Sequence, residues 1–162
     1  FITNIAESGV ERVPGTAVFM TPDPESVPHA LLHSLKHYKA LHEQVVILSV
    51  KVFDVPYVPA LDRVEVHHLS GNFAQVVVQY GFKDEPDIPA ALALCGEAGL
   101  TLDMMDTSFF LGRETLIPKL GSSMAYWRAL IFVAMFRNAG SATAFFKIPS
   151  NRVVELGSQV VL

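Results

Sequence analysis

Three histidines recur at four-residue intervals near the start of the chain, His29, His33 and His37, with Lys36 beside them. On a helix this spacing places all three imidazoles on one face. Two histidines four residues apart can share a metal ion, but the same segment supplies no cysteine or acid to complete a site, and we expect no metal. The sequence leaves two interpretations: a solvated polar face, or a surface on which His33, Lys36 and His37 bind a phosphate-bearing ligand.

Two arginines stand next to predicted strands, and each has two interpretations. Arg113 follows the end of a predicted strand over 106–112, and Arg152 follows Pro149 where the last predicted strand begins. Charged groups at the carboxyl edge of a parallel sheet can bind a ligand, such as the phosphates of a nucleotide. The alternative, which we favour, is a local ion pair that fixes the turn, because few surface ion pairs have a functional role.

Residues that could act in catalysis are isolated from one another in the sequence. Cys95 lies between Leu94 and Gly96 in an apolar segment, so a buried, inert thiol is expected. His67 and His68 are adjacent on a predicted strand and point to opposite faces. No Gly-x-Ser-x-Gly elbow, Walker loop or dinucleotide fingerprint is present. We expect no enzymatic activity and no cofactor, with a hydrolase whose triad is assembled in space as the alternative.

Composition indicates one domain with a partner other than nucleic acid. The 162 residues suit a single domain with a sizeable core. Hydrophobic residues make up 51% of the chain and charged residues 17%, so we expect part of the surface to meet a partner. A net charge of −4 gives no basic footprint for nucleic acid. The single cysteine excludes an internal disulfide, and a first residue other than methionine, Phe1, suggests a piece of a longer chain.

The segment 43–54 is the element around which the predicted fold is arranged. Its run Val45–Leu48 is apolar and rich in β-branched residues, which is typical of a strand covered on both faces. The alternation over 49–53 predicts that one face meets water further along. A strand of this kind belongs near the middle of a sheet, with helices packed over it.

A strand over 16–21 and a helix over 28–41 precede this segment. The helix has an apolar face formed by Leu31, Leu35 and Tyr38, opposite the histidines. A strand, a helix and a second strand in this order predict a right-handed parallel crossover.

The remaining elements complete the prediction of an α/β (mixed α+β) domain with one mixed sheet and helices packed on it. The predicted order is strand–helix–strand, β-hairpin, helix–strand–helix, strand. These later elements are strands over 63–69 and 73–82 around Ser70-Gly71-Asn72, a helix over 90–98 ended by Gly99, a strand over 106–112, a helix over 122–138, and a strand over 152–162 with a bulge at Gly157.

The helix over 122–138 is apolar around nearly its whole circumference. A helix of this kind is buried on every side, either in the core or against a second subunit or a membrane-embedded domain, and the pattern fits both. No apolar run in the chain reaches the roughly 18 residues of a membrane span. The residues that would form an interface are Trp127, Leu130, Ile131 and Phe136.

Several longer segments carry a resemblance to a known family and together cover nearly everything after Glu11. The segments are Arg12–Thr21, Leu31–His33, Leu35–His37, Lys39–Glu43, Tyr80–Phe82, Phe109–Thr115, Trp127–Arg128, Arg137–Ala139 and Phe146–Gly157. In these segments the chain resembles the C-terminal cytosolic domain of Kup-type (KUP/HAK/KT family) potassium uptake transporters. Two positions depart from the pattern: Tyr38 replaces an asparagine, and the chain ends in valines and leucine where an acidic residue is expected.

The resemblance implies a parent protein whose bundle of transmembrane helices imports potassium together with protons. Residues 1–13 would be a linker from that membrane domain, and residues 14–162 a single cytosolic domain at the cytoplasmic face of the inner membrane. Its implied role is regulation or assembly of a homodimer, and potassium and protons would be handled by the membrane part of the same polypeptide. The alternative is a nucleotide-sensing module, because some such transporters respond to cyclic di-adenylate.

Overall fold

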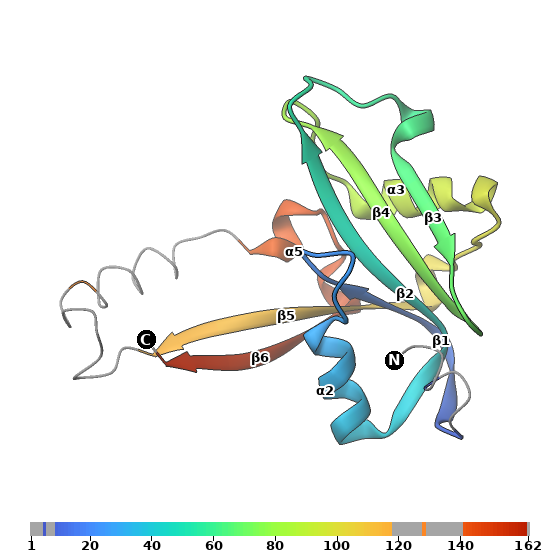
Figure 1. Ribbon diagram of the computed structural model, residues 1–162, viewed down its shortest axis with the longest axis vertical. Helices are drawn as coiled ribbons and strands as arrows, with labels where there is room; N and C mark the ends of the chain where they lie inside the picture. Colours follow the sequence, from blue (N-terminus) through green and yellow to red (C-terminus); the bar gives the residue numbers. More distant parts are fainter. Residues whose placement is uncertain (1–4, 6–8, 118–127, 129–140, 162) are drawn as a thin grey trace.

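The computed structural model describes residue 5 and residues 9–117, 128 and 141–161 (Figure 1). In this part of the chain six strands form one sheet in the order β3-β4-β2-β1-β5-β6. Neighbouring strands are parallel except for the antiparallel pair β3–β4, so the predicted α/β class with one mixed sheet is confirmed. The strands are β1 (Glu11–Met20), β2 (Ala40–Phe53), β3 (Val64–His68), β4 (Phe73–Gly81), β5 (Thr107–Ile117) and β6 (Val153–Val161).

The predicted crossover is formed by β1, helix α2 (His29–Tyr38) and β2, which is parallel to β1. The helix ends three residues before the predicted Leu41, because Lys39 has a left-handed backbone with φ of 55° and terminates it. Leu41 already belongs to β2, where it pairs with Arg12. The right-handedness of the crossover and the linker boundary at residue 14 stay predictions, and β1 begins at Glu11.

Strand β2 lies between β1 and β4, as its continuous apolar run predicts. Residues Val45–Leu48 are buried, which confirms a strand covered on both faces. The predicted alternation further along is wrong, because Lys51, Val52 and Phe53 are all exposed. The covering helices protect only the first part of this strand, and its last residues project beyond them (Figure 1).

Two hydrophobic cores lie on opposite faces of the sheet. On one face, α2 packs against β1, β2 and β5 through residues such as Leu31, Phe19 and Phe110. The rings of Phe19 and Phe110 stack with centroids 4.7 Å apart. On the other face, helix α3 (Ile88–Leu94) and the following 3-10 turn, Cys95–Ala98, pack on the sheet, and Phe146 beyond the short helix α5 (Ala142–Phe145) joins them. The domain therefore has three layers, with the sheet in the middle.

The later elements occur in the predicted order with some changes. α3 begins at Ile88 and gives way to a 3-10 turn at Cys95, β5 runs five residues past the predicted end at residue 112, and the short helix α5 was not predicted. Strands β3 and β4 form the expected hairpin, and Gly99, with φ of 81°, ends the segment begun by α3. The predicted bulge at Gly157 is wrong, because β5 and β6 pair in unbroken register and Gly157 faces Arg113. Except for Arg128, the predicted helix over 122–138 lies outside the described residues. No helix among the described residues is long and apolar enough to cross a membrane.

Candidate functional site

The histidine face lies on the outer side of α2. His29, Lys36 and His37 are exposed, and the rings of His33 and His37 lie against each other with centroids 4.3 Å apart. Tyr38, predicted on the apolar face of this helix, is 64% exposed because the helix ends beside it. Within the described part of the chain, no group of three histidine, cysteine or acidic side chains is arranged to hold a metal ion.

Arg113 forms an ion pair, as the sequence favours, but the pair does not fix a turn. β5 continues to Ile117, past the predicted end at residue 112, so Arg113 lies within the strand and its partner is on β6. Nη1 of Arg113 lies 3.1 Å from Oε2 of Glu155, and Thr143 of α5 donates a hydrogen bond of 3.4 Å to the other oxygen of that carboxylate. The arginine side chain is 72% exposed, so the pair contributes little to stability and the guanidinium stays accessible. Arginine at this position can still exchange its partner for an anionic ligand.

The structure separates the predicted ligand-binding residues. On β5, Phe110 packs with α2, whereas Leu111 packs on the opposite face, and Arg113 shares the face of Leu111. Arg113 and the histidine face therefore lie on opposite sides of the sheet. Arg152 is half-buried in a 3-10 turn before β6, about 15 Å along the strand from the position opposite Arg113. No single ligand-binding site is formed by these five residues.

An apolar groove lies where the connections of the sheet change direction. From β1, the chain runs through α2 to β2 on one side, and β5 lies on the other side of β1. In open α/β sheets, ligands bind in the crevice at the carboxyl ends of such strands. A groove of about 320 Å³ lies beyond the carboxyl end of β1, over Leu111 and Gly112 in the middle of β5, and Arg113 is the next residue of that strand. The sequence could not reveal this groove, because it depends on strand order. Its lining includes Met20, Thr21, Leu111, Gly112, Ala142 and Phe146.

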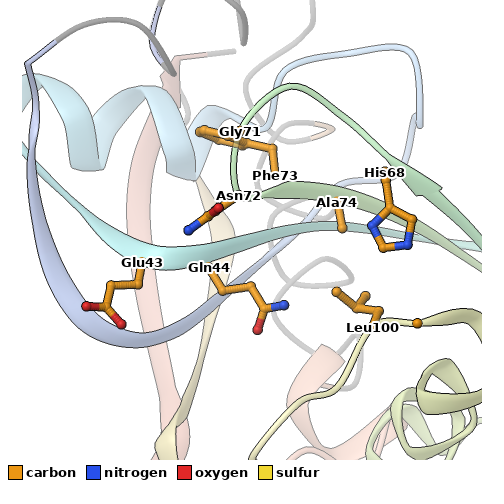
Figure 2. A pocket seen from close by; sticks show the side chains of 9 residues that line it. Glu43, Gln44, His68, Gly71, Asn72, Phe73, Ala74 and Leu100 are labelled. Atoms are coloured by element: carbon orange, nitrogen blue, oxygen red, sulfur yellow. The ribbon is translucent and has the colours of Figure 1, made fainter.

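A second pocket, of about 410 Å³, lies near the amino ends of β2 and β4 (Figure 2). In Figure 2, Glu43 and Gln44 are neighbours on β2 and point apart, and His68 lies on the far side of the opening. Gln44 accepts a hydrogen bond of 3.0 Å from Thr16, and His68 Nε2 lies 3.3 Å from the carbonyl oxygen of Ala98. These polar groups are engaged with the protein and do not converge on one point.

Several exposed hydrophobic residues lie on the last part of β2, in the loop 54–63 and in the turn 81–84. Figure 1 shows that this loop and turn lie at the same end of the sheet, at the carboxyl ends of β2 and β4. Large exposed apolar surfaces on a soluble domain mark interaction sites. The apolar surplus in the composition predicts such a surface but not its place. We call this part of the domain the apolar end. Val52 and Phe53 are successive in β2 and so point to opposite faces of the sheet. The residues of the apolar end are Val52, Phe53, Val55, Tyr57, Leu61 and Phe82.

The backbone beneath the apolar end is held by one carboxylate. Asp84 accepts hydrogen bonds from the backbone N–H of Gly81, at 2.7 Å, and of Val58, at 3.0 Å. Arg63 donates to the same carboxylate at 3.2 Å and to the carbonyl of Val58, and its guanidinium lies 4.9 Å from the ring centroid of Tyr80. The backbone N–H groups of Gly81 and Val58, followed by Arg63, lower the pKa of Asp84. These contacts fix the loop and the turn against each other.

The cysteine has the environment of a structural residue. Cys95 is fully buried in the core under α3, and burial raises the pKa of its thiol to about 11. A nucleophilic cysteine needs an accessible thiolate, which this position denies.

We expect Cys95 to resist thiol reagents in the folded chain at pH 8 and to react fully in urea. The measurement uses a disulfide reagent that releases thionitrobenzoate and follows the absorbance of this product with time. The reaction rate of a free thiol compound with the same reagent is the control. Rapid reaction of the folded chain would contradict the burial that the structure gives this side chain.

Comparison with known proteins places the chain in a family. Residues 14–162 match the model of the K+ potassium transporter C-terminal domain. The chain belongs to this family. The family resemblance found in the sequence is therefore confirmed, and no solved structure matches the chain.

Several curated relatives of the family cover this chain end to end. The chain is 85% identical over all 162 residues to probable potassium transport system protein Kup 3 of Dechloromonas aromatica (strain RCB), and 59% identical over its full length to probable potassium transport system protein Kup of Azoarcus sp. (strain BH72). It spans 26% and 25% of the lengths of these two relatives. The relatives are named as transport proteins and not as enzymes.

Proposed function

We propose that this chain is the cytosolic C-terminal domain of a potassium–proton symporter and that it regulates and assembles the transporter without forming the ion path. The proposal places it at the cytoplasmic face of the inner membrane, joined to a transmembrane domain in the same polypeptide. Potassium and protons are handled by that membrane part. Support comes from the family, from relatives named as potassium transport proteins, and from the fraction of their length that the chain spans.

The observation that carries the proposal is the apolar end. Docking requires an exposed apolar surface on a backbone that does not have to be ordered on binding. The side chains of Tyr57 and Phe82 provide the surface, and the carboxylate of Asp84 holds the backbone that presents them. The one thiol of the chain is buried and so is not an accessible nucleophile. In this proposal the domain works by contact with other parts of the transporter.

The test is potassium uptake by the complete transporter in cells that lack other uptake systems. A transporter that ends at residue 10 of the present numbering, and so lacks the rest of this domain, should reach the membrane and still take up potassium. Its uptake rate and its oligomeric state should both differ from those of the intact protein. The Tyr57→Ser variant of the complete transporter should change the same two properties without loss of membrane abundance. An unchanged rate and an unchanged oligomeric state in both variants would exclude regulation and assembly.

The second proposal is a nucleotide-sensing module, which the apolar groove beside β1 and β5 favours. The base of a nucleotide could enter the groove between Met20 and Phe146. The phosphate of the same nucleotide would then replace the carboxylate of Glu155 as the ion-pair partner of Arg113. Calorimetry with adenine nucleotides and cyclic dinucleotides tests it, with Arg113→Gln as the variant and Arg12→Gln as the control. Flat traces at millimolar ligand would end this proposal and leave the first one intact.

A further inference from the structure

The first residues of β1 are paired on one side only. Glu11–Val13 pairs with Ala40–His42 of β2, whereas among the described residues pairing of β1 with β5 begins at Thr16. The register of β1 against β2 shifts between these two parts, so Pro14 and Gly15 interrupt the ladder. We call Glu11–Val13 the entry segment, because in the proposed parent the membrane part precedes it. It is attached to the sheet by β2 alone.

One histidine of β2 connects the entry segment with the core beneath α2. The ring of His42 lies edge-on to the ring of Phe110 on β5, with centroids 5.8 Å apart. Phe110 in turn stacks on Phe19 of β1, so aromatic rings join three strands of the sheet. The carbonyl of His42 accepts a hydrogen bond of 3.0 Å from Nη1 of Arg12, which belongs to the entry segment. The half-buried ring of His42 and the pairing of the entry segment are therefore parts of one contact.

The charged groups around His42 do not offset the burial of its ring. Asp106, in the turn before β5, interacts with the ring electrostatically, and Arg12 of β1 is bonded to the backbone carbonyl of His42. α2 contributes apolar side chains to the core that contains Phe110, and its lysine and histidines lie on the outer side. Burial lowers the pKa of His42 below 6.5, and Asp106 opposes this effect only in part.

The lowered pKa makes the contact of His42 weaker in acid. A histidine of this kind takes up a proton more readily when its ring is exposed to water than when it is packed. Above about pH 6.5 the ring is neutral in both arrangements, and the packed one has its full stability. As the pH falls from 6.5 to the folded-state pKa, protonation favours the exposed ring, and below that pKa the difference stays constant. The neighbour that is paired on one side only opens most easily.

We propose that His42 is a pH-sensitive switch, which keeps the entry segment paired with β2 at neutral pH and releases it in mild acid. The inference goes beyond the proposed function, because it names a signal, the cytosolic proton concentration, and the segment that responds to it. Release of these three residues would lengthen the connection between the membrane part and the folded domain by about 10 Å. Only this consequence for the transporter rests on the proposed function.

Hydrogen exchange of the 162-residue chain, followed by mass spectrometry between pH 7.5 and pH 5, tests the proposal. Protection factors, which correct for the intrinsic effect of pH on exchange, are compared between peptides with the entry segment and peptides from β4. We expect protection of the entry segment to fall several-fold over this range while protection of β4 keeps its value. His42→Phe keeps an aromatic ring beside Phe110 and takes up no proton, so protection of its entry segment should be independent of pH.

Two further variants separate His42 from the other titrating groups. Asp106 favours the protonated ring, so Asp106→Asn should move the fall in protection to lower pH. His29 is exposed at the start of α2, away from this contact, so His29→Gln should leave the fall unchanged. Protection of β4 at pH 7.5 verifies that each variant is folded.

Three results would overturn the proposal. The first is protection of the entry segment that does not change with pH in the wild-type chain. The second is the same fall in His42→Phe as in the wild type, because another group would then be the switch. The third is an equal fall in β4, since acid would then unfold the whole domain. None of these results bears on assembly or regulation in general, which potassium uptake by the complete transporter tests separately.

Discussion

Replacing Gly81 with alanine should lower the free energy of unfolding by about 3 kcal/mol, the largest effect we expect from a single added methyl group in this chain. A Cβ at Gly81 would collide with the carbonyl oxygens of Val55 and Pro56, the latter at 2.5 Å. These are backbone atoms, so they can move only if the loop over the apolar end moves with them. The variant should also weaken the hydrogen bond from the backbone N–H of Gly81 to Asp84.

Urea unfolding followed by circular dichroism measures this effect, with Gly112→Ala as the matched control. Both glycines lie in strands, but a Cβ at Gly112 would meet nothing within 4 Å. We expect Gly112→Ala to change stability by less than about 1 kcal/mol, in either direction. Equal stabilities for the two variants would show that the loop does not pack on Gly81 as the structure has it.

Asp84→Asn should destabilise the domain strongly at neutral pH and much less in acid. The backbone N–H of Gly81 and of Val58 and the guanidinium of Arg63 all donate to the carboxylate of Asp84, which lowers its pKa in the folded chain from 3.8. Its stabilising effect is therefore complete well above pH 4 and is lost as the pH falls through the folded-state pKa. A carboxamide turns one acceptor into a donor, so at least one of these N–H groups loses its partner.

The measurement is the thermal midpoint of wild type and variant between pH 7 and pH 2, because the folded-state pKa of Asp84 lies below 3.8. The midpoint of Asp84→Asn should lie several degrees below that of wild type at pH 7, and the gap should close as the wild-type carboxylate is protonated. Asp62→Asn, an exposed aspartate in the same loop region, is the control. A gap of constant size over the whole range would mean that ionisation of Asp84 does not stabilise the loop.

The order of elements could be predicted from the sequence because local patterns specify it. The apolar run at Val45–Leu48 predicts a strand covered on both faces, and Ser70-Gly71-Asn72 predicts the hairpin. The end of α2 could not be predicted, because it depends on a left-handed Lys39, a conformation that lysine rarely adopts. The exposed end of β2 could not be predicted either, since the reach of the covering helices is a property of the packed domain.

The contacts of the candidate site residues could be predicted only in part, because they also depend on how the domain packs. The ion pair of Arg113 could be anticipated as a class of interaction, but its partner Glu155 is 42 residues away and is brought close by strand pairing. The separation of Arg113 from His33 follows from the alternation of β5 and from the face that α2 covers. The role of Asp84 depends on three donors from three segments, so nothing in the turn sequence around it marks this residue.

The most direct test of docking through the apolar end is hydroxyl-radical footprinting of tyrosines in the complete transporter, in membranes, against the dilute isolated chain. Tyr57 and Tyr38 have the same exposure in the isolated domain and lie at different places on it. We predict that modification of Tyr57 becomes much slower in the assembled transporter while modification of Tyr38 keeps its rate. Equal rates for Tyr57 in the two samples would contradict docking through this surface.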